Sequence, residues 1–181
     1  LWLFTDLEPH AIIQDVNSVF ADIFSANEKF NHEFNHQGLI GRARRGLAVV
    51  TCMDARIDPL EALGLRIGDA VILRNPGARV TDDVLRALIL AVYVLGVERI
   101  LVMPHTDCKM TKMTDAELHD LIATRYGVDT RDVAFGTIPD QMATLRADLT
   151  RIRTSRHLPG RLAVCGALYD VGTGRLAPIE A

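Results

Sequence analysis

Apolar positions along the chain follow two spacings, one typical of buried strands and one typical of helices. Short runs rich in β-branched residues predict strands, and these lie at 47–54, 68–75, 98–104 and 160–179. Apolar residues three and four apart, or capping residues at the ends, predict helices at 12–30, 58–64, 80–96, 114–126 and 139–153. Because strands alternate with helices, we expect an α/β fold with a central, mostly parallel β-sheet flanked by helices. The last segment turns at Gly172–Gly174, which predicts a C-terminal edge strand or hairpin.

Two helical segments carry more apolar residues than a surface helix of one chain needs. The segment 12–30 belongs to an N-terminal helical arm, residues 1–37, that is rich in large apolar groups. In the segment 80–96 the apolar residues nearly circle the helix axis, which predicts burial on more than one side. The sequence contains no internal repeat and no second domain, so we expect one domain over residues 1–181.

The composition is that of an ordinary globular protein and argues against two classes of partner. Hydrophobic residues make up 49% of the 181 residues, charged residues make up 24%, and the net charge is −3. There is no long basic run, so nothing indicates nucleic-acid binding. The longest apolar stretch, residues 84–97, is too short to span a bilayer and contains Arg86, so no membrane partner is expected.

The cysteine count points to a reducing compartment. Three cysteines are an odd, low number for a chain of this size, which argues against a disulfide scaffold. No signal-peptide pattern is visible, and we therefore expect a cytoplasmic protein. Cys165 lies inside the apolar run RLAVCGAL and is expected to be a small buried hydrophobic residue.

The other two cysteines and one histidine lie at the ends of predicted strands. Cys52 ends the first strand, and His105 and Cys108 follow the third. A lone histidine or cysteine at such a place is more often structural than chemical. Parallel strands, however, place their carboxyl ends along one edge of the sheet, so these three side chains can converge if the two strands are neighbours. Two sulfurs and one ring nitrogen are the ligand set of a catalytic zinc site with an open fourth position.

The segment CMDARIDP adds an acid and a base next to the first cysteine. Asp54 and Arg56 follow Cys52 by two and four residues. A zinc site needs such a pair nearby to position a nucleophile and a small anion. The alternative is an ordinary surface ion pair at the start of a helix, which contributes little to stability.

These motifs together resemble those of the β-class carbonic anhydrases. The pattern C-x-D-x-R in CMDAR, followed about fifty residues later by H-x-x-C in HTDC, is similar to the metal motifs of that family. Similarity extends over nearly the whole chain, through SANEKF, GDAVILRNPG and GALYDVGTGRL. The residues that fill these motifs are most similar to those of the short, single-domain bacterial branch.

The resemblance implies a zinc-dependent enzyme that reversibly hydrates carbon dioxide to bicarbonate and a proton. It implies one Zn²⁺ per subunit, with Cys52, His105 and Cys108 as the ligands. Asp54 would accept a hydrogen bond from solvent on the zinc, or ligate zinc itself in a resting form, and Arg56 would hold Asp54 off the metal. Gly77 matches a turn that lines the substrate site. The family also implies a homodimer or a higher multiple of dimers, with the arm 1–37 packed on the partner subunit.

Two positions depart from the family pattern, and other functions stay open. Lys109 stands where the family has glycine and would strain the turn if that residue needs a positive φ. Pro76 replaces an alanine, stiffens its turn and removes one backbone donor. The same fold and zinc site can hydrolyse COS or CS₂. A zinc- or anion-binding module without turnover is a second alternative. A thiol redox protein is a third, but the sequence has no C-x-x-C motif.

Overall fold

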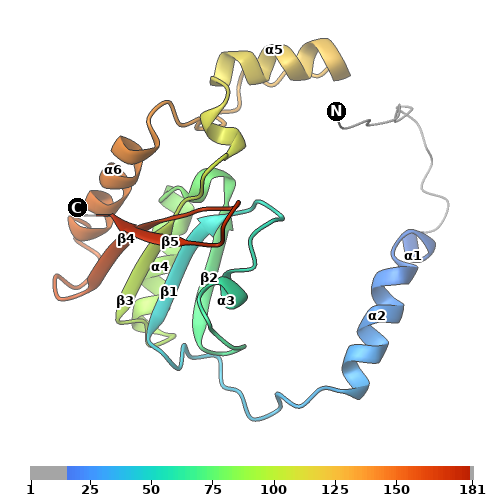
Figure 1. The fold of residues 1–181 in the computed structure, drawn as a ribbon, viewed down its shortest axis with the longest axis vertical. Coiled ribbons are helices and arrows are strands. Elements are labelled where there is room, and N and C mark those ends of the chain that lie inside the picture. Colours follow the sequence, from blue (N-terminus) through green and yellow to red (C-terminus); the bar gives the residue numbers. More distant parts are fainter. Residues whose placement is uncertain (1–15, 180–181) are drawn as a thin grey trace. The chain divides into compact units, whose positions relative to one another are not determined.

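The computed structural model describes residues 16–179, and a five-stranded sheet lies at its centre (Figure 1). The first four strands run parallel to their neighbours, and the fifth lies antiparallel to the fourth at the edge. The strands are β1 (Leu47–Cys52), β2 (Ala70–Asn75), β3 (Arg99–Met103), β4 (Ala163–Tyr169) and β5 (Leu176–Ile179), in the order β2-β1-β3-β4-β5. The predicted α/β fold with a mostly parallel sheet and a C-terminal hairpin is therefore confirmed.

The chain divides into two compact units, Leu1–Leu39 and Ile40–Ala181. The first unit contains α1 (Val16–Val19) and α2 (Ala21–His32), which confirms the predicted helix from Val16 onward, with a break at Phe20. Residues 12–15 of that prediction lie outside the described residues. No residue of α2 is buried, and its aromatic and aliphatic side chains are exposed. The second unit contains the whole sheet and the remaining helices.

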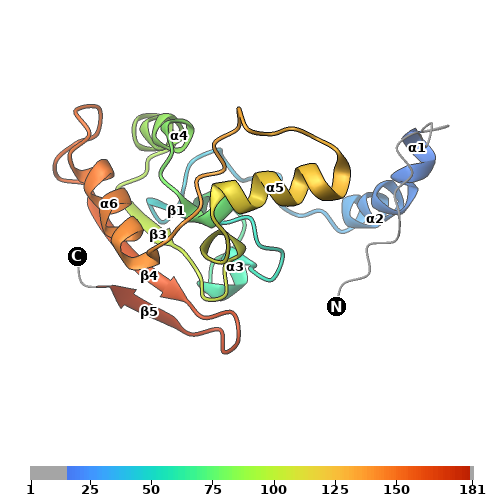
Figure 2. The same cartoon turned by 90° about the horizontal axis from the view of Figure 1, so that it is seen from above.

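Helices cover the two faces of the sheet unequally. On one face, α4 (Asp82–Tyr93) and α6 (Gln141–Arg153) pack against β1 and β3, with Leu88 and Leu149 fully buried. The short α3 (Pro59–Ala62) lies on the opposite side of the sheet from α4, as Figure 2 shows. A smaller apolar cluster on this second face includes both Cys52 and Cys108.

Side-chain caps fix where the helices begin, as the sequence predicts. The Asp58 carboxylate accepts the backbone N–H groups of Leu60 and Glu61, and Thr81 accepts an N–H group in the first turn of α4. Thr114 and Glu117 form a reciprocal capping box at the start of α5 (Asp115–Tyr126). These local signals set the lengths of the segments that connect the strands.

Two burial predictions differ from what the single chain shows. α4 is buried on one side only, because Leu90, Tyr93 and Val94 on its outer surface are 50%, 65% and 62% exposed. No other element in the described part of the unit Ile40–Ala181 covers that surface. Cys165 is exposed rather than buried. Its neighbour Gly166 packs on α6, so the alternation of a strand turns Cys165 to the opposite face, which α4 and α6 leave uncovered.

Within the described residues, no helix combines the length and apolar content that a membrane crossing requires.

Candidate metal centre

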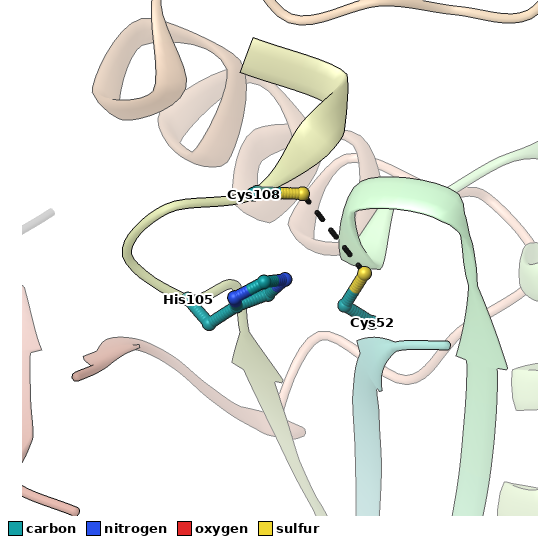
Figure 3. A group of neighbouring side chains, drawn as sticks. All are labelled: Cys52, His105 and Cys108. Atoms are coloured by element: carbon teal, nitrogen blue, oxygen red, sulfur yellow. Dashed lines mark hydrogen bonds between the residues drawn. The ribbon is translucent and has the colours of Figure 1, made fainter. Parts of the chain in front are cut away.

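Three side chains converge at the carboxyl ends of β1 and β3, as the sequence predicts. Cys52 is the last residue of β1, and His105 and Cys108 lie in the loop that follows β3. The two strands are paired in parallel, with Thr51 beside Met103, so their ends lie next to each other. One ligand atom from each of the three residues lies within 4.8 Å of the other two (Figure 3). All three residues are buried.

The distance between the two sulfurs suits a tetrahedral metal ion. Cys52 Sγ and Cys108 Sγ are 4.0 Å apart. Two thiolates at the usual zinc–sulfur length would be about 3.8 Å apart in a tetrahedral site. Neither cysteine forms a disulfide, so both sulfurs are available as ligands. Their spacing therefore fits a Zn²⁺ ion without movement of the backbone.

The imidazole of His105 is oriented for the same purpose. Its Nδ1 lies 2.8 Å from the Thr106 carbonyl oxygen, so Nδ1 carries the proton and Nε2 keeps its lone pair. Nε2 is buried and has no hydrogen-bond partner. The Gln141 side chain donates to the His105 carbonyl oxygen at 2.9 Å and fixes the residue from α6. A buried ring nitrogen without a partner is costly, and a cation bound between it and the two sulfurs removes that cost.

The three groups also polarise one another. A hydrogen bond from Cys108 is the main cause that lowers the pKa of Cys52, and His105 and the Gly77 N–H lower it further. The pKa of Cys108 is raised, because the sulfur of Cys52 beside it takes the negative charge and because burial disfavours a second charge. Burial lowers the pKa of His105, but the contacts with Cys52 outweigh it and the net shift is upward. The negative charge on the Cys52 sulfur therefore favours a bound cation in this pocket.

Asp54 and Arg56 form a two-point ion pair beside the cluster. Arg56 Nε donates to Asp54 Oδ1 at 2.9 Å, and Nη2 donates to Oδ2 at 2.8 Å. These hydrogen bonds hold the pKa of Asp54 well below its usual range, so the carboxylate stays ionised. Asp54 Oδ2 is 3.8 Å from His105 Nε2, which is too long for a hydrogen bond but places the carboxylate at the mouth of the cluster. The pair is thus more than a surface ion pair at a helix start.

Gly77 contacts a candidate ligand through its backbone. Its N–H points at Cys52 Sγ, 3.3 Å away, and φ is +76°. A Cβ at this position would lie 2.5 Å from Ile138 Cδ1. The sequence predicts Gly77 only as part of a turn near the substrate. The structure shows an additional reason for glycine, which is close approach to a sulfur.

The two departures from the family pattern do not disturb this geometry. Pro76 begins a short 3₁₀ turn, and the Gly77 donor that follows it is intact. Lys109 is exposed, begins a second 3₁₀ turn, and is not among the described residues with positive φ. The condition for strain at Lys109, a positive φ, is therefore not met. The residue in that loop with a positive φ is Asp107, at +55°.

Three residues that support the site were not singled out from the sequence. Arg74 donates to the carbonyl oxygens of Cys52 and Asp54, at 3.0 and 2.7 Å, and so shapes the turn after β1. Gln141 holds the His105 carbonyl, and Asp107 contacts Arg56. Arg74 lies in the stretch GDAVILRNPG and Asp107 lies in HTDC, and both stretches carry the family resemblance. The contacts of Gln141 and Asp107 depend on long-range packing.

Comparisons with known proteins agree with this geometry. A family profile described as carbonic anhydrase matches residues 47–125. Beta-carbonic anhydrase 1 of Mycobacterium tuberculosis is 35% identical over 130 residues, which cover 72% of this chain and 79% of that protein. The carbon disulfide hydrolase of Saccharolobus solfataricus is 46% identical over 74 residues, which cover 41% of this chain and 36% of that protein. The crystal structure of a carbonic anhydrase from Streptococcus mutans aligns with a TM-score of 0.84 and 37% identity, over 92% of this chain and all of that chain.

Proposed function

The chain belongs to the β-carbonic anhydrase family, and we propose that it reversibly hydrates carbon dioxide to bicarbonate and a proton at the Cys52–His105–Cys108 cluster. Its family places it among the lyases. The observation that carries the proposal is the buried, unpartnered Nε2 of His105 facing two free sulfurs at metal-binding distance. No ordinary packing role explains that arrangement.

We propose one Zn²⁺ per subunit as the cofactor. Two soft thiolates and an imidazole favour zinc over magnesium or calcium. When bound at such a site, zinc lowers the pKa of water and so supplies a nucleophile near neutral pH. Three protein ligands leave one position open, as catalytic zinc sites do and structural ones do not.

Asp54 is suited to orient the attacking water. Both of its oxygens are held by Arg56, and its lowered pKa keeps it ionised. It can therefore accept a hydrogen bond from water, but it cannot act as an acid near neutral pH. With one O–H of the water donated to Asp54 in this way, a lone pair of the water oxygen faces the substrate. Arg56, in turn, keeps the Asp54 carboxylate from moving further towards His105 Nε2.

The structure offers a matched pair of variants to test this function. Cys52→Ser removes a candidate ligand, whereas Cys165→Ser makes the same chemical change at an exposed cysteine outside the cluster. We expect Cys52→Ser to lose zinc and carbon dioxide hydration together, and Cys165→Ser to keep both. The measurements are zinc per chain by atomic absorption and the hydration rate by stopped flow. Full zinc content in the wild type without hydration would instead indicate a zinc- or anion-binding module.

A second substrate class has direct support from the comparisons. The carbon disulfide hydrolase matches this chain at 46% identity over 74 residues. CS₂ and COS are linear molecules like carbon dioxide, so the same cluster can present water to them. Parallel assays with carbon dioxide, COS and CS₂ on one zinc-loaded preparation decide between the substrates. Hydration of carbon dioxide should be the fastest reaction.

We further propose a homodimer or a multiple of dimers in a reducing cytoplasm. The support is the apolar surface of α2, which its own unit, Leu1–Leu39, does not bury: α2 has no buried residue, and Ile23 and Phe24 are 58% and 53% exposed. The arm 1–37 would cover such surface on a partner subunit. Light scattering after size exclusion gives the mass directly, and a monomer at micromolar concentration would contradict the proposal. The reducing location follows from the need to keep the Cys52 and Cys108 thiols free.

A further inference from the structure

Arg56 is shared between two carboxylates that come from different loops. Its Nε and Nη2 face Asp54, two residues earlier on the loop after β1. Its Nη1 donates to Asp107 Oδ2 at 3.1 Å, and its Nη2 also donates to the Asp107 carbonyl oxygen at 3.2 Å. Asp54 thus occupies one edge of the guanidinium group, and Asp107 occupies the other.

The position of Asp107 in the chain makes this contact a link between two loops of the metal centre. Asp107 lies between His105 and Cys108, on the loop that supplies two of the three candidate metal ligands. The Asp54–Arg56 pair by itself joins two residues of the same short turn and cannot fix that turn relative to the other loop. The contact of Arg56 with Asp107 makes this link, directly beside the cluster.

The backbone at Asp107 is shaped for the contact as well. Its φ of +55° lies in the left-handed region, which few residues other than glycine, asparagine and aspartate adopt readily. The conformation directs both the carbonyl oxygen and the carboxylate of one residue to the same guanidinium group. The side chain is 62% exposed, so the ion pair contributes little to folding.

We propose that Asp107 is a positioning residue: it locks Arg56 to the His105–Cys108 loop and so fixes the Asp54 carboxylate relative to the metal-ligand atoms. The proposal rests on the proposed carbon dioxide hydration and adds a residue to its machinery. Asp107 does not touch the reacting atoms. It acts through Arg56, and Arg56 acts through Asp54.

Two substitutions separate the side chain of Asp107 from its backbone conformation. Asp107→Asn keeps the shape and tolerates the positive φ but removes the charge, and Asp107→Gly keeps the φ and removes the side chain. We expect both to retain zinc and to lose roughly tenfold in kcat, with an equal loss in kcat/KM, the effect typical of residues that orient a metal site from behind the ligands. Lys112→Gln is the matched control, because Lys112 Nζ lies 3.5 Å from the same carboxylate but has no contact with Arg56.

A double-mutant cycle and an NMR measurement show whether Asp107 acts through Arg56. In an Arg56→Lys background, Asp107→Asn should cause no further loss of activity. The guanidinium signals of Arg56, assigned by their absence in Arg56→Lys, should be separately resolved in the wild type and in Lys112→Gln. In Asp107→Asn they should merge, because Nη1 loses its charged partner and the group rotates more easily, although the backbone carbonyl oxygen at position 107 remains. This second readout does not depend on turnover.

The outcomes distinguish the two proposals. Merged Arg56 signals with reduced kcat in Asp107→Asn, and no additional loss in the Arg56→Lys background, support the positioning role. Unchanged Arg56 signals, full activity in both Asp107 variants, or an equal loss in the Arg56→Lys background overturn it. If zinc-loaded wild type does not hydrate carbon dioxide, the proposed function fails, and the NMR comparison alone decides whether Asp107 positions Arg56.

Discussion

Substitution of Gly77 by alanine tests how the fold and the metal site are joined. Gly77 combines a φ of +76° with a backbone N–H that points at Cys52 Sγ. An added Cβ would lie 2.5 Å from Ile138 Cδ1 and 3.4 Å from the Met110 side chain. Ile138 is 2% exposed, so its side chain has little room to turn away. The alanine variant therefore meets a backbone penalty and a packing penalty at the same position.

The two penalties can be estimated separately. A residue with a Cβ in the left-handed region costs about 1–2 kcal/mol. One methyl group forced into a well-packed core costs about 1–3 kcal/mol. Their sum gives a loss of about 2–5 kcal/mol in the free energy of unfolding. Because relief of the clash shifts the Gly77 backbone, its N–H moves away from Cys52, and zinc affinity should fall as well.

Two other glycines each isolate one of these terms. At Gly64 φ is +60° but nothing lies within 4 Å of an added Cβ, so Gly64→Ala is destabilised by the backbone conformation alone. Gly166 has no positive φ, but an added Cβ would lie 2.9 Å from Leu149 Cδ1, so Gly166→Ala is destabilised by packing alone. We expect the loss in Gly77→Ala to approach the sum of the two. Neither control should alter zinc affinity.

The assay is urea unfolding of each variant without zinc and with zinc in excess, together with a competition measurement of zinc affinity. Ile138→Val removes the atom of closest contact, and by itself costs about 0.5–1.5 kcal/mol. Combined with Gly77→Ala, it should restore stability rather than lower it further. A Gly77→Ala variant no less stable than Gly64→Ala, or one with wild-type zinc affinity, would refute the reasoning.

The remaining predictions concern charge and the loop at Lys109. Asp54→Asn should retain zinc but lose most of its turnover in a stopped-flow assay; normal turnover would contradict the orienting role of the carboxylate. Because the folded-state pKa of Asp54 lies below its value in the unfolded chain, the carboxylate stabilises the fold at neutral pH and this stabilisation disappears as the pH falls below about 4. The urea midpoint of the zinc-free wild type should therefore fall on acidification more steeply than that of Asp54→Asn, and parallel curves would contradict this. Two thiolates at the site disfavour deprotonation of the attacking water relative to three neutral imidazoles, so the hydration rate should rise from pH 6 to 9; a flat or falling profile would oppose this. Lys109→Gly should lower the stability by about 0.5–1 kcal/mol, because Lys109 has no positive φ for glycine to relieve, and a gain would show hidden strain.

Local signals explain why most of the fold could be predicted from the sequence. The cap at Asp58 and the capping box at Thr114 act within a few residues of where they are read. The strands are short apolar runs between such signals, and right-handed crossovers then place their ends along one edge. The convergence of Cys52, His105 and Cys108 needed only one additional condition, that β1 and β3 are neighbours, and they are.

Burial could not be read in the same way where it depends on more than one chain or on strand register. The apolar outer surface of α4 predicts burial correctly only if something covers it, and the described residues of the unit Ile40–Ala181 do not cover Tyr93 or Val94. Cys165 lies in an apolar run, but its exposure depends on which face of β4 it occupies and on which helices lie there. A hydrophobic pattern indicates that a side chain is buried in the assembled protein. It does not indicate which helix, strand or partner chain covers that side chain.

Three contacts that position the site were not predicted from the sequence, because each joins residues that are far apart in the chain. Gly77 to Cys52, Gln141 to His105 and Arg56 to Asp107 each link residues 25, 36 and 51 positions apart. Each is an atom-to-atom contact of about hydrogen-bond length, and it depends on a different pair of elements: β2 and β1, α6 and β3, or β1 and β3. A shift of one residue between the two elements would abolish the contact. Each contact fixes a protein group: the Cys52 sulfur, the His105 carbonyl oxygen or the Arg56 guanidinium group. The ligand motif identifies the atoms that would bind a cation. The positions of those atoms depend on the three contacts. We therefore expect relatives with identical ligand motifs to differ in rate where these three contacts differ.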